Sequence, residues 1–445
     1  LSTPRYTGAA NLRAMVELGR MWEIGSDTDC DEVAALRIKE RLLGQAFAVA
    51  AQIVEEQICT MEDVDRGAKV GLRWSRGPFE IANRIGIAEA VGMARAYADE
   101  ARIALPTWFA ERDSAFEFSY VDVEIDGGIA TVRLNRPEAM NALNVTLVSQ
   151  LGEAIDKLNE RDDVSTIVLD GAGKAFVAGA DVKFFVDKIR QDSFQEVYDF
   201  TAHGHEVLNA IESSPKTTIA LATGLALGGG LELALACDYR VGTQRTQLRF
   251  PETSIGIYPG LGGTQRTTRI CGIGAARYAV LAGNFMDAGT ASALGLLTHL
   301  VESSGVSATV AELALAGKPD ERYPGRPADA SNPVASFASA FYSDANMAAI
   351  ASGDAPPGFE AEDPHVARQL KSLSRTAPLA LQAASAAGRC STSTSMRWLL
   401  TRETPTISPM PAPGSWLISS AGMRSLPSSS VTQAMEVPAM GRGAK

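Results

Sequence analysis

A run of glycines and two glutamates form the part of the sequence best suited to chemistry. Gly228–Gly230 precede an apolar stretch in which Glu232 is the only charged residue up to Cys237. Glu252 follows 20 residues after Glu232. A helix that begins at glycines presents unpaired N–H groups and partial positive charge, and no Cβ blocks an anionic oxygen from approaching them. We therefore expect a site that stabilises an enolate oxygen and holds a water molecule between two carboxyl groups.

Each of these features has a structural alternative. Glycine-rich sequences also form packing turns, so the triplet alone is weak evidence for a site. An ionised carboxylate inside an apolar helix is costly unless it is paired or functional. Because the stretch from Leu231 to Cys237 contains no basic residue, the structural alternative for Glu232 requires an arginine from a distant part of the chain.

Composition limits the classes of function. The chain has 445 residues, a net charge of −11 and a pI of about 5.1, which suits two or three domains and argues against a nucleic-acid partner. Its apolar runs are too short to span a bilayer, and it shows no secretory signal. The five cysteines include no CxxC pair, so we expect no metal site, no disulfide framework and a cytoplasmic location without a membrane partner. Residue 1 is Leu, so we expect the chain to begin inside a longer polypeptide.

Residues 1–116 are predicted to form a helical domain. Over Asp31–Ile58 the apolar residues recur on one helix face. Thr60 predicts the capped start of a second helix, and Gly77-Pro78 the start of another, from Phe79 to about Asp99.

From about Ser119 the pattern changes to strands alternating with helices. Alternating apolar residues over Val121–Leu134 flank a Gly-Gly turn and predict a hairpin. Strand–strand–helix units then recur, so we expect an α/β (α+β) fold with a ββα spiral core. The predicted domains are a core over 117–305, a C-terminal helical extension over 306–389 and a disordered tail over 390–445. The tail loses all helical periodicity in mid-helix, and we hypothesise that it is translated out of frame.

Three short motifs mark the helical domain: MEDVDRG at 61–67, GLRW at 71–74 and RGPFE at 76–80. Over Val33 to Met93 the sequence resembles the C-terminal helical domain of 3-hydroxyacyl-CoA dehydrogenases. Those enzymes also need a GxGxxG cofactor turn and a catalytic histidine. Here no GxGxxG follows a strand in the first part of the chain, and the first histidine is His203. We therefore expect no NAD site, no other cofactor and no hydride transfer, and we assign this domain a packing role.

Four further motifs follow in order: RLNRPEAMNALN at 133–144, KAFVAGADVK at 174–183, ALGGGLELALACD at 226–238 and FPETSIGIYPGLGGTQR at 250–266. In order and spacing they resemble the signature blocks of the crotonase (enoyl-CoA hydratase/isomerase) superfamily, over Ser119 to Ser303. The resemblance implies an oxyanion hole formed by the backbone N–H groups of Ala180 and Gly229. It further implies that Glu252 protonates the α-carbon and that Glu232 deprotonates the water that attacks the β-carbon.

The resemblance also implies which residues bind the CoA thioester. Ala139 and Ala178 would line the adenine pocket, and Gly260 would close the wall of the active site. The remaining predicted CoA-binding residues, along the thioester and pantetheine, are Asp181, Val182 and Lys183, and Asp181 is also expected to cap a helix.

Other charged residues and histidines remain open or are set aside. Lys174 would face either CoA phosphates or solvent. Arg266 would either face CoA phosphates or have an interior packing role or a role at a helix start. His203 and His205 lie one residue apart along a helix-like stretch and are predicted to be non-catalytic.

The predicted function is hydration of a short-chain trans-2-enoyl-CoA, such as crotonyl-CoA, by half of a bifunctional hydratase/dehydrogenase. An enoyl-CoA isomerase and an inactive CoA-binding remnant are the alternatives. The predicted partner is acyl-CoA, and the resemblance implies a homotrimer or hexamer if the C-terminal helices form.

Overall fold

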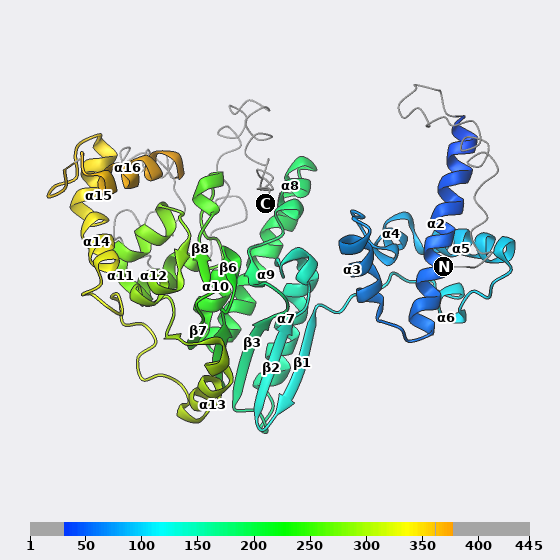
Figure 1. Ribbon diagram of the computed structural model, residues 1–445, viewed down its shortest axis with the longest axis horizontal. Helices are drawn as coiled ribbons and strands as arrows, with labels where there is room; N and C mark the ends of the chain where they lie inside the picture. Colours follow the sequence, from blue (N-terminus) through cyan, green and yellow to red (C-terminus); the bar gives the residue numbers. More distant parts are fainter. Residues whose placement is uncertain (1–30, 361, 377–445) are drawn as a thin grey trace, which may run out of the picture. The chain divides into compact units, whose positions relative to one another are not determined.

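The computed structural model describes residues 31–360 and 362–376, and the chain divides after Phe118 into two compact units. The first, the helical unit, contains α2 (Glu32–Glu55), α3 (Met61–Gly71), α4 (Pro78–Ile85), α5 (Ile87–Ala101) and α6 (Thr107–Ala110) (Figure 1). Its core is a group of touching aromatic rings, formed by Phe47, Phe79, Phe109 and Phe116. Burial of these large apolar rings is the main source of stability for a unit of this size.

The single helix predicted from Phe79 to Asp99 is wrong, because two helices occupy this stretch. Gly86 separates α4 from α5 with a φ of 105°, a value that ends a right-handed helix and that glycine adopts readily. At the other end of α4, the Asp65 carboxylate accepts hydrogen bonds from the amides of Phe79 and Glu80, both at 2.9 Å. A Cβ on Gly77 would lie 2.1 Å from Asp65 Cγ, so the carboxylate from α3 occupies the place of a local N-cap side chain.

The second unit begins at Ser119 and is built on two sheets. The larger has the strand order β1-β2-β3-β5-β7-β10 and the smaller β4-β6-β8-β9. Their bounds are β1 Val121–Asp126, β2 Ile129–Leu134, β3 Thr166–Gly171, β4 Ala175–Ala178, β5 Thr217–Leu221, β6 Leu225–Leu227, β7 Tyr239–Gly242, β8 Gln247–Arg249, β9 Met286–Asp287 and β10 His299–Leu300. From β3 to β8 successive strands alternate between the sheets, so each turn of the chain over this stretch adds one strand to each. This is the predicted ββα spiral.

The hairpin predicted over Val121–Leu134 is confirmed. β1 and β2 pair antiparallel with Val121 opposite Leu134, around a turn at Gly127-Gly128 in which both glycines have positive φ. The pairs β2–β3, β3–β5 and β5–β7 are all parallel, which requires a crossover between strands. Figure 1 shows β1, β2 and β3 side by side at one edge of the larger sheet.

Helices fill the crossovers of this unit and extend beyond the sheets. They are α7 Val145–Asn159, α8 Val182–Arg190, α9 Phe194–Glu212, α10 Gly229–Ala236, α11 Gly263–Leu281, α12 Ala288–Ala293, α13 Val306–Ala316, α14 Pro333–Phe341, α15 Asp344–Ser352 and α16 Pro364–Thr376, with 3-10 turns η1 Pro137–Ala139, η2 Glu252–Ile255 and η3 Ser303–Gly305. Every residue of α10 is buried, and this helix contacts β4, β6, α9 and α11. A helix that is apolar all round fits such a central position.

The C-terminal extension predicted over 306–389 is described as far as Thr376, where α16 ends. The rest of it, together with the tail 390–445 and its out-of-frame hypothesis, lies outside the described residues. Among the helices of the described part, none combines the length and apolarity needed to cross a bilayer.

Candidate active site

The start of α10 is built so that only glycine fits. A Cβ on Gly230 would lie 2.0 Å from the carbonyl oxygen of Val177, on the neighbouring strand β4. Gly228 has a φ of 48°, in the region where L-residues are strained. The glycine triplet therefore lets the backbone of α10 lie directly against β4, and this contact places the loop that follows β4 beside the helix N-terminus.

Ala180 and Gly229 lie next to each other at this contact. The nitrogen of Ala180 lies 3.8 Å from the position that a Cβ on Gly229 would take. The flanking amides are used by the fold, since Asp181 N donates to Leu143 O and Gly228 N donates to Arg249 O. The amides of Ala180 and Gly229 make none of the loop and cap hydrogen bonds found in the described part of the chain. Ala180 and Gly229, whose amides are predicted to form the oxyanion hole, thus lie next to each other.

Glu232 lies on α10, one turn from Gly229, and its side chain is only 2% exposed. Its Oε1 accepts hydrogen bonds from Leu261 N and Gly263 N, both at 2.7 Å. Burial raises the pKa of Glu232 from 4.5 to about 7, although the two amides and the charge of Arg266 act to lower it. The acid that the sequence left without a partner is therefore held by backbone amides from the loop before α11.

Glu252 begins the short turn η2 and is 9% exposed. Its Oε1 lies 2.5 Å from the position of a Cβ on Gly228, which places the carboxyl group against the glycine triplet. Its Oε2 is buried and has no hydrogen-bond partner among the described residues. Burial, and then the charge of Glu232, raise the pKa of Glu252 to about 8.

The two acids therefore differ in the order in which they ionise. Glu232 has two amide donors and the charge of Arg266 to lower its pKa. Glu252 faces the negative charge of Glu232, which raises its pKa more than either its own backbone amide or the charge of Arg249 lowers it. The arrangement favours an ionised Glu232 beside a protonated Glu252, since hydrogen bonds stabilise the first charge and repulsion opposes the second. One group can accept a proton while the other donates one.

The turn before β4 and the start of β4, the strand that leads to Ala180, are held by a residue that the sequence did not single out. The Asn141 amide donates to the carbonyl oxygens of Ala172, Ala175 and Phe176, at 3.0, 2.9 and 3.1 Å. Asn141 is fully buried. It stands within the RLNRPEAMNALN motif, which was the only available signal, but a motif does not reveal which carbonyl groups an asparagine will bind.

The predicted CoA-binding residues lie in three places. Ala178 N donates to Met140 O at 3.0 Å, so the segment that contains Ala139 lies beside β4. Val182 and Lys183 are exposed in the first turn of α8. Gly260, in the loop before α11, receives a hydrogen bond from His205 through its backbone.

Asp181 stands at the N-cap position of α8, but the prediction that its side chain caps the helix is wrong. No cap hydrogen bond forms, and the carboxylate instead pairs with Arg136 Nη2 at 3.1 Å. The half-buried arginine competes for the carboxylate, because a charge-assisted bond is stronger than a bond to a neutral amide.

The interior alternative for Arg266 is the one that the structure supports. Its side chain is 3% exposed and makes hydrogen bonds to Glu212, Asn209 and Leu261. Lys174 is exposed. His203 Nδ1 lies 3.4 Å from Glu206, and burial lowers the pKa of His205. In the described part of the chain, no group of three or more His, Cys, Asp or Glu residues is arranged to hold a metal ion.

Comparisons with known proteins agree with both resemblances. Residues 129–410 match the enoyl-CoA hydratase/isomerase family, and residues 38–111 match the C-terminal domain of 3-hydroxyacyl-CoA dehydrogenase. A short-chain-enoyl-CoA hydratase of Clostridium acetobutylicum is 36% identical over 199 residues, 44% of this chain and 75% of that protein. A crotonyl-CoA hydratase of Syntrophomonas wolfei is 35% identical over 198 residues, with the same shares.

A crystal structure of an enoyl-CoA hydratase from Bacillus anthracis matches with a TM-score of 0.42 and 32% identity, over 44% of this chain and 76% of that one. The family match spans more than half of the chain, and the two hydratases are matched over three quarters of their own length. The chain therefore belongs to the enoyl-CoA hydratase/isomerase family.

Proposed function

We propose that the protein is an enoyl-CoA hydratase that adds water across the double bond of a short-chain trans-2-enoyl-CoA. The observation that carries the proposal is the pair of buried carboxyl groups, Glu232 and Glu252, on either side of the start of α10. The fold leaves Glu252 Oε2 without a partner in the described residues, and buried polar atoms are rarely left so without a function. An isomerase needs one acid, whereas water addition uses two.

In the proposed reaction the thioester oxygen accepts hydrogen bonds from the amides of Ala180 and Gly229. Ionised Glu232 takes a proton from water, and the resulting hydroxide bonds to the β-carbon. The electron pair of the double bond moves towards the thioester, so negative charge develops on its oxygen. The two amides stabilise this charge without reorganising, which contributes roughly 3–4 kcal/mol per donor in comparable sites.

Protonated Glu252 completes the reaction by giving its proton to the α-carbon, which yields the 3-hydroxyacyl-CoA. Glu232 is then protonated and Glu252 is ionised. A proton must pass from Glu232 to Glu252, directly or through solvent, before the next turnover. The raised pKa values of both groups support rapid exchange near neutral pH, because neither group holds its proton far more tightly than the other.

The substrate assignment rests on family membership and on the names of the relatives. The family match spans the segment that holds both glutamates, and two of the relatives are named short-chain-enoyl-CoA hydratase and crotonyl-CoA hydratase. We therefore propose acyl-CoA as the ligand, with Ala139, Ala178 and Gly260 along its path. Asp181, whose carboxylate is paired with Arg136, would shape this path together with Val182 and Lys183.

Loss of the enoyl absorbance of crotonyl-CoA tests the proposal directly. We expect the wild-type chain to consume the substrate, and we expect Glu232→Gln and Glu252→Gln each to lower kcat by roughly 10²- to 10⁴-fold. Isomerase activity that survives Glu232→Gln, measured with a 3-enoyl-CoA, would instead favour the isomerase. A folded wild-type protein that binds CoA but consumes neither substrate would be the inactive remnant.

Cofactor use, assembly and compartment are further proposals. We propose that the chain transfers no hydride, since the helical unit has no histidine, and we expect no NADH formation from 3-hydroxybutyryl-CoA and NAD. A homotrimer or hexamer is proposed from the family resemblance and is tested by sedimentation. A reducing, cytoplasmic compartment suits the free thiols of Cys59, Cys237 and Cys271.

A further inference from the structure

The loop that holds Glu232 is itself held by Arg266. Arg266 Nη1 donates to Leu261 O at 2.8 Å, and Leu261 N donates to Glu232 Oε1 at 2.7 Å. Arg266 thus binds the carbonyl group of Leu261, and the amide group of Leu261 binds Glu232. A Cβ on Gly262 would lie 2.3 Å from Arg266 Nη1, so the guanidinium group packs directly on the turn between the two amides that contact Glu232.

Glu212, at the end of α9, fixes the guanidinium group from the opposite side. Its Oε2 accepts from Arg266 Nε at 2.7 Å and lies 2.6 Å from Arg266 Nη2, which also donates to Asn209 Oδ1 at 2.9 Å. Arg269 does not replace this contact, since its Nη1 lies 3.9 Å from Glu212 Oε1. Nearby positive charges and a hydrogen bond from Tyr323 keep the pKa of Glu212 below its ordinary value despite burial.

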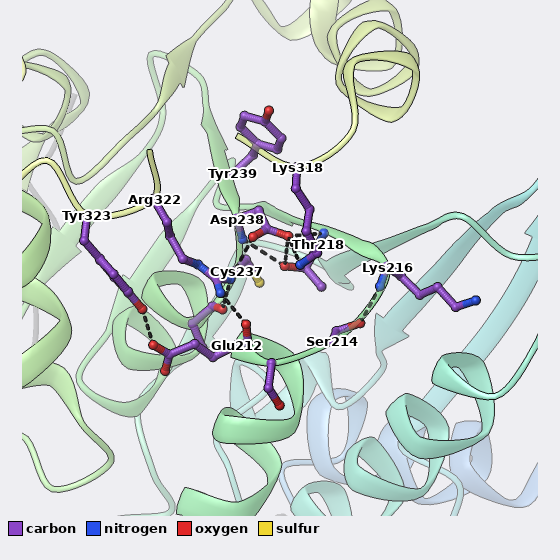
Figure 2. Close-up of polar contacts among 12 residues, drawn as sticks. Glu212, Ser214, Lys216, Thr218, Cys237, Asp238, Tyr239, Lys318, Arg322 and Tyr323 are labelled. Carbon is purple, nitrogen blue, oxygen red and sulfur yellow. Dashed lines mark hydrogen bonds and ion pairs between the residues drawn. The ribbon is translucent and has the colours of Figure 1, made fainter. Parts of the chain in front are cut away.

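A segment more than 100 residues away in sequence completes the arrangement. Tyr323 donates its hydroxyl hydrogen to Glu212 Oε1, and Arg322 donates to the carbonyl oxygen of Glu212. Figure 2 shows Tyr323 pointing at the Glu212 carboxylate and Arg322 reaching between Glu212 and Asp238. Both oxygens of Glu212 are therefore occupied, which restricts the position of Arg266.

We propose that Arg266, clamped by Glu212 and Tyr323, is a positioning residue that holds the Leu261 amide on Glu232 and keeps Glu232 ionised for proton abstraction. The inference rests on the proposed hydratase function and goes beyond it, because it assigns a role to three residues outside the predicted catalytic and CoA-binding set. The guanidinium group acts through the bound peptide and also through its charge, since a positive charge near a buried carboxylate favours the ionised form.

The charged and titratable groups that face Glu232 come from three elements. Arg266 on α11 and Glu252 in η2 act on it directly. Glu212 on α9 compensates the charge of Arg266, and His205 on the same helix contacts the loop at Gly260 and has a lowered pKa. A neutral His205 adds no charge at neutral pH, so Arg266 is the cation whose removal should raise the pKa of Glu232.

Three variants separate geometry from charge. We expect Arg266→Met to lower kcat roughly 10- to 100-fold with little change in KM, and to move the acidic limb of the pH–rate profile upward by about one pH unit. Arg266→Lys keeps the positive charge but loses the planar set of guanidinium N–H donors. We therefore expect kcat to fall while the acidic limb of the pH–rate profile stays in place. Tyr323→Phe should lower kcat by a smaller factor, since it loosens Glu212 alone.

Arg277→Met is the matched control. Arg277 lies on the same helix, is fully buried, and binds Tyr342 O at 3.0 Å and Asp344 at 2.7 Å, away from Glu232. An equal shift of the acidic limb in Arg277→Met would overturn the proposal, because the effect would then follow from loss of any buried arginine in α11. The proposal would also be overturned if folded Arg266→Met kept both the wild-type kcat and an unshifted acidic limb. If Arg266→Met does not fold, the same result in Arg266→Lys and Tyr323→Phe would overturn it.

A spectroscopic titration makes the test independent of turnover. The carboxyl infrared bands of wild type minus Glu232→Gln report the pKa of Glu232 in the free protein, and Arg266→Met should raise that pKa. If the wild type does not hydrate crotonyl-CoA but the pKa rises, the hydratase assignment fails and the positioning role stands. If turnover is normal and the pKa does not rise, the positioning role fails alone.

Discussion

Replacing Glu232 by glutamine tests both the proposed reaction and the stability of the fold. The buried negative charge of Glu232 is needed for proton abstraction, but it destabilises the folded state. The glutamine carbonyl oxygen can accept the hydrogen bonds that Leu261 N and Gly263 N now give to Oε1. The local geometry should therefore survive. The variant loses its base, and we expect kcat to fall by roughly 10²- to 10⁴-fold.

The effect on stability follows from the pKa of Glu232, which burial raises from 4.5 to about 7. The folded state binds the proton more tightly than the unfolded chain, so the free energy of unfolding falls as pH rises from 4.5 to about 7. At about 1.4 kcal/mol per pH unit, the ionised carboxylate costs about 3 kcal/mol above pH 7. Burial of the glutamine NH₂ offsets about 1 kcal/mol of this gain.

We therefore expect Glu232→Gln to be more stable than wild type by about 2 kcal/mol at pH 8, and to lose that advantage near pH 4.5. Urea unfolding of the second unit at both pH values, with crotonyl-CoA turnover on the same samples, measures both quantities. Glu153→Gln is the control, because Glu153 is exposed and pairs only with Lys157 on the surface. An active Glu232→Gln, or one no more stable than wild type at pH 8, would refute the reasoning.

Three other predictions concern different parts of the fold. Gly230→Ala places a Cβ 2.0 Å from Val177 O, and we expect urea unfolding to show a loss of about 1–3 kcal/mol and turnover to fall more than tenfold. Asp65→Ala removes the acceptor for two amides of α4, so calorimetry should show the helical unit destabilised by about 1–2 kcal/mol with hydratase turnover unchanged. Burial raises the pKa of Cys237 and of Cys271 to about 12, so mass spectrometry should find both unmodified after iodoacetamide treatment of the native protein at pH 8.

The fold followed from the sequence where local pattern and motif agreed. Alternating residues around two glycines predicted the β1–β2 hairpin, and the glycine triplet predicted the start of α10. Gly86 was missed, because an isolated glycine within a helical pattern is usually tolerated and its φ of 105° depends on how α4 and α5 pack. Local periodicity does not contain that information.

The sequence was enough to predict the two acids of the site, but not the groups that bind them. Glu232 was predicted to be a functional carboxylate, with pairing to a distant arginine as the structural alternative. The structure supplies two backbone amides, which have no sequence signature, with Arg266 behind them. The role of Arg266 depends on Glu212, 54 residues earlier, and on Tyr323, 111 residues from Glu212. Because the sequence does not indicate these contacts, it cannot distinguish an arginine that faces a phosphate from an arginine that is buried under a loop.

The proposed reaction requires that one acid is ionised while the other is protonated. Burial alone does not produce this difference between the two acids. Burial raises the pKa of both carboxyl groups and would leave two protonated acids with no base. Two amides and one guanidinium group act on Glu232, whereas Glu252 Oε2 has no partner among the described residues. The hydrogen bonds therefore decide which acid gives up its proton first. If the donors lay beside Glu252 instead, the same two residues would exchange roles. In the proposed reaction the placement of Leu261, Gly263 and Arg266 therefore sets the direction in which protons move across the substrate.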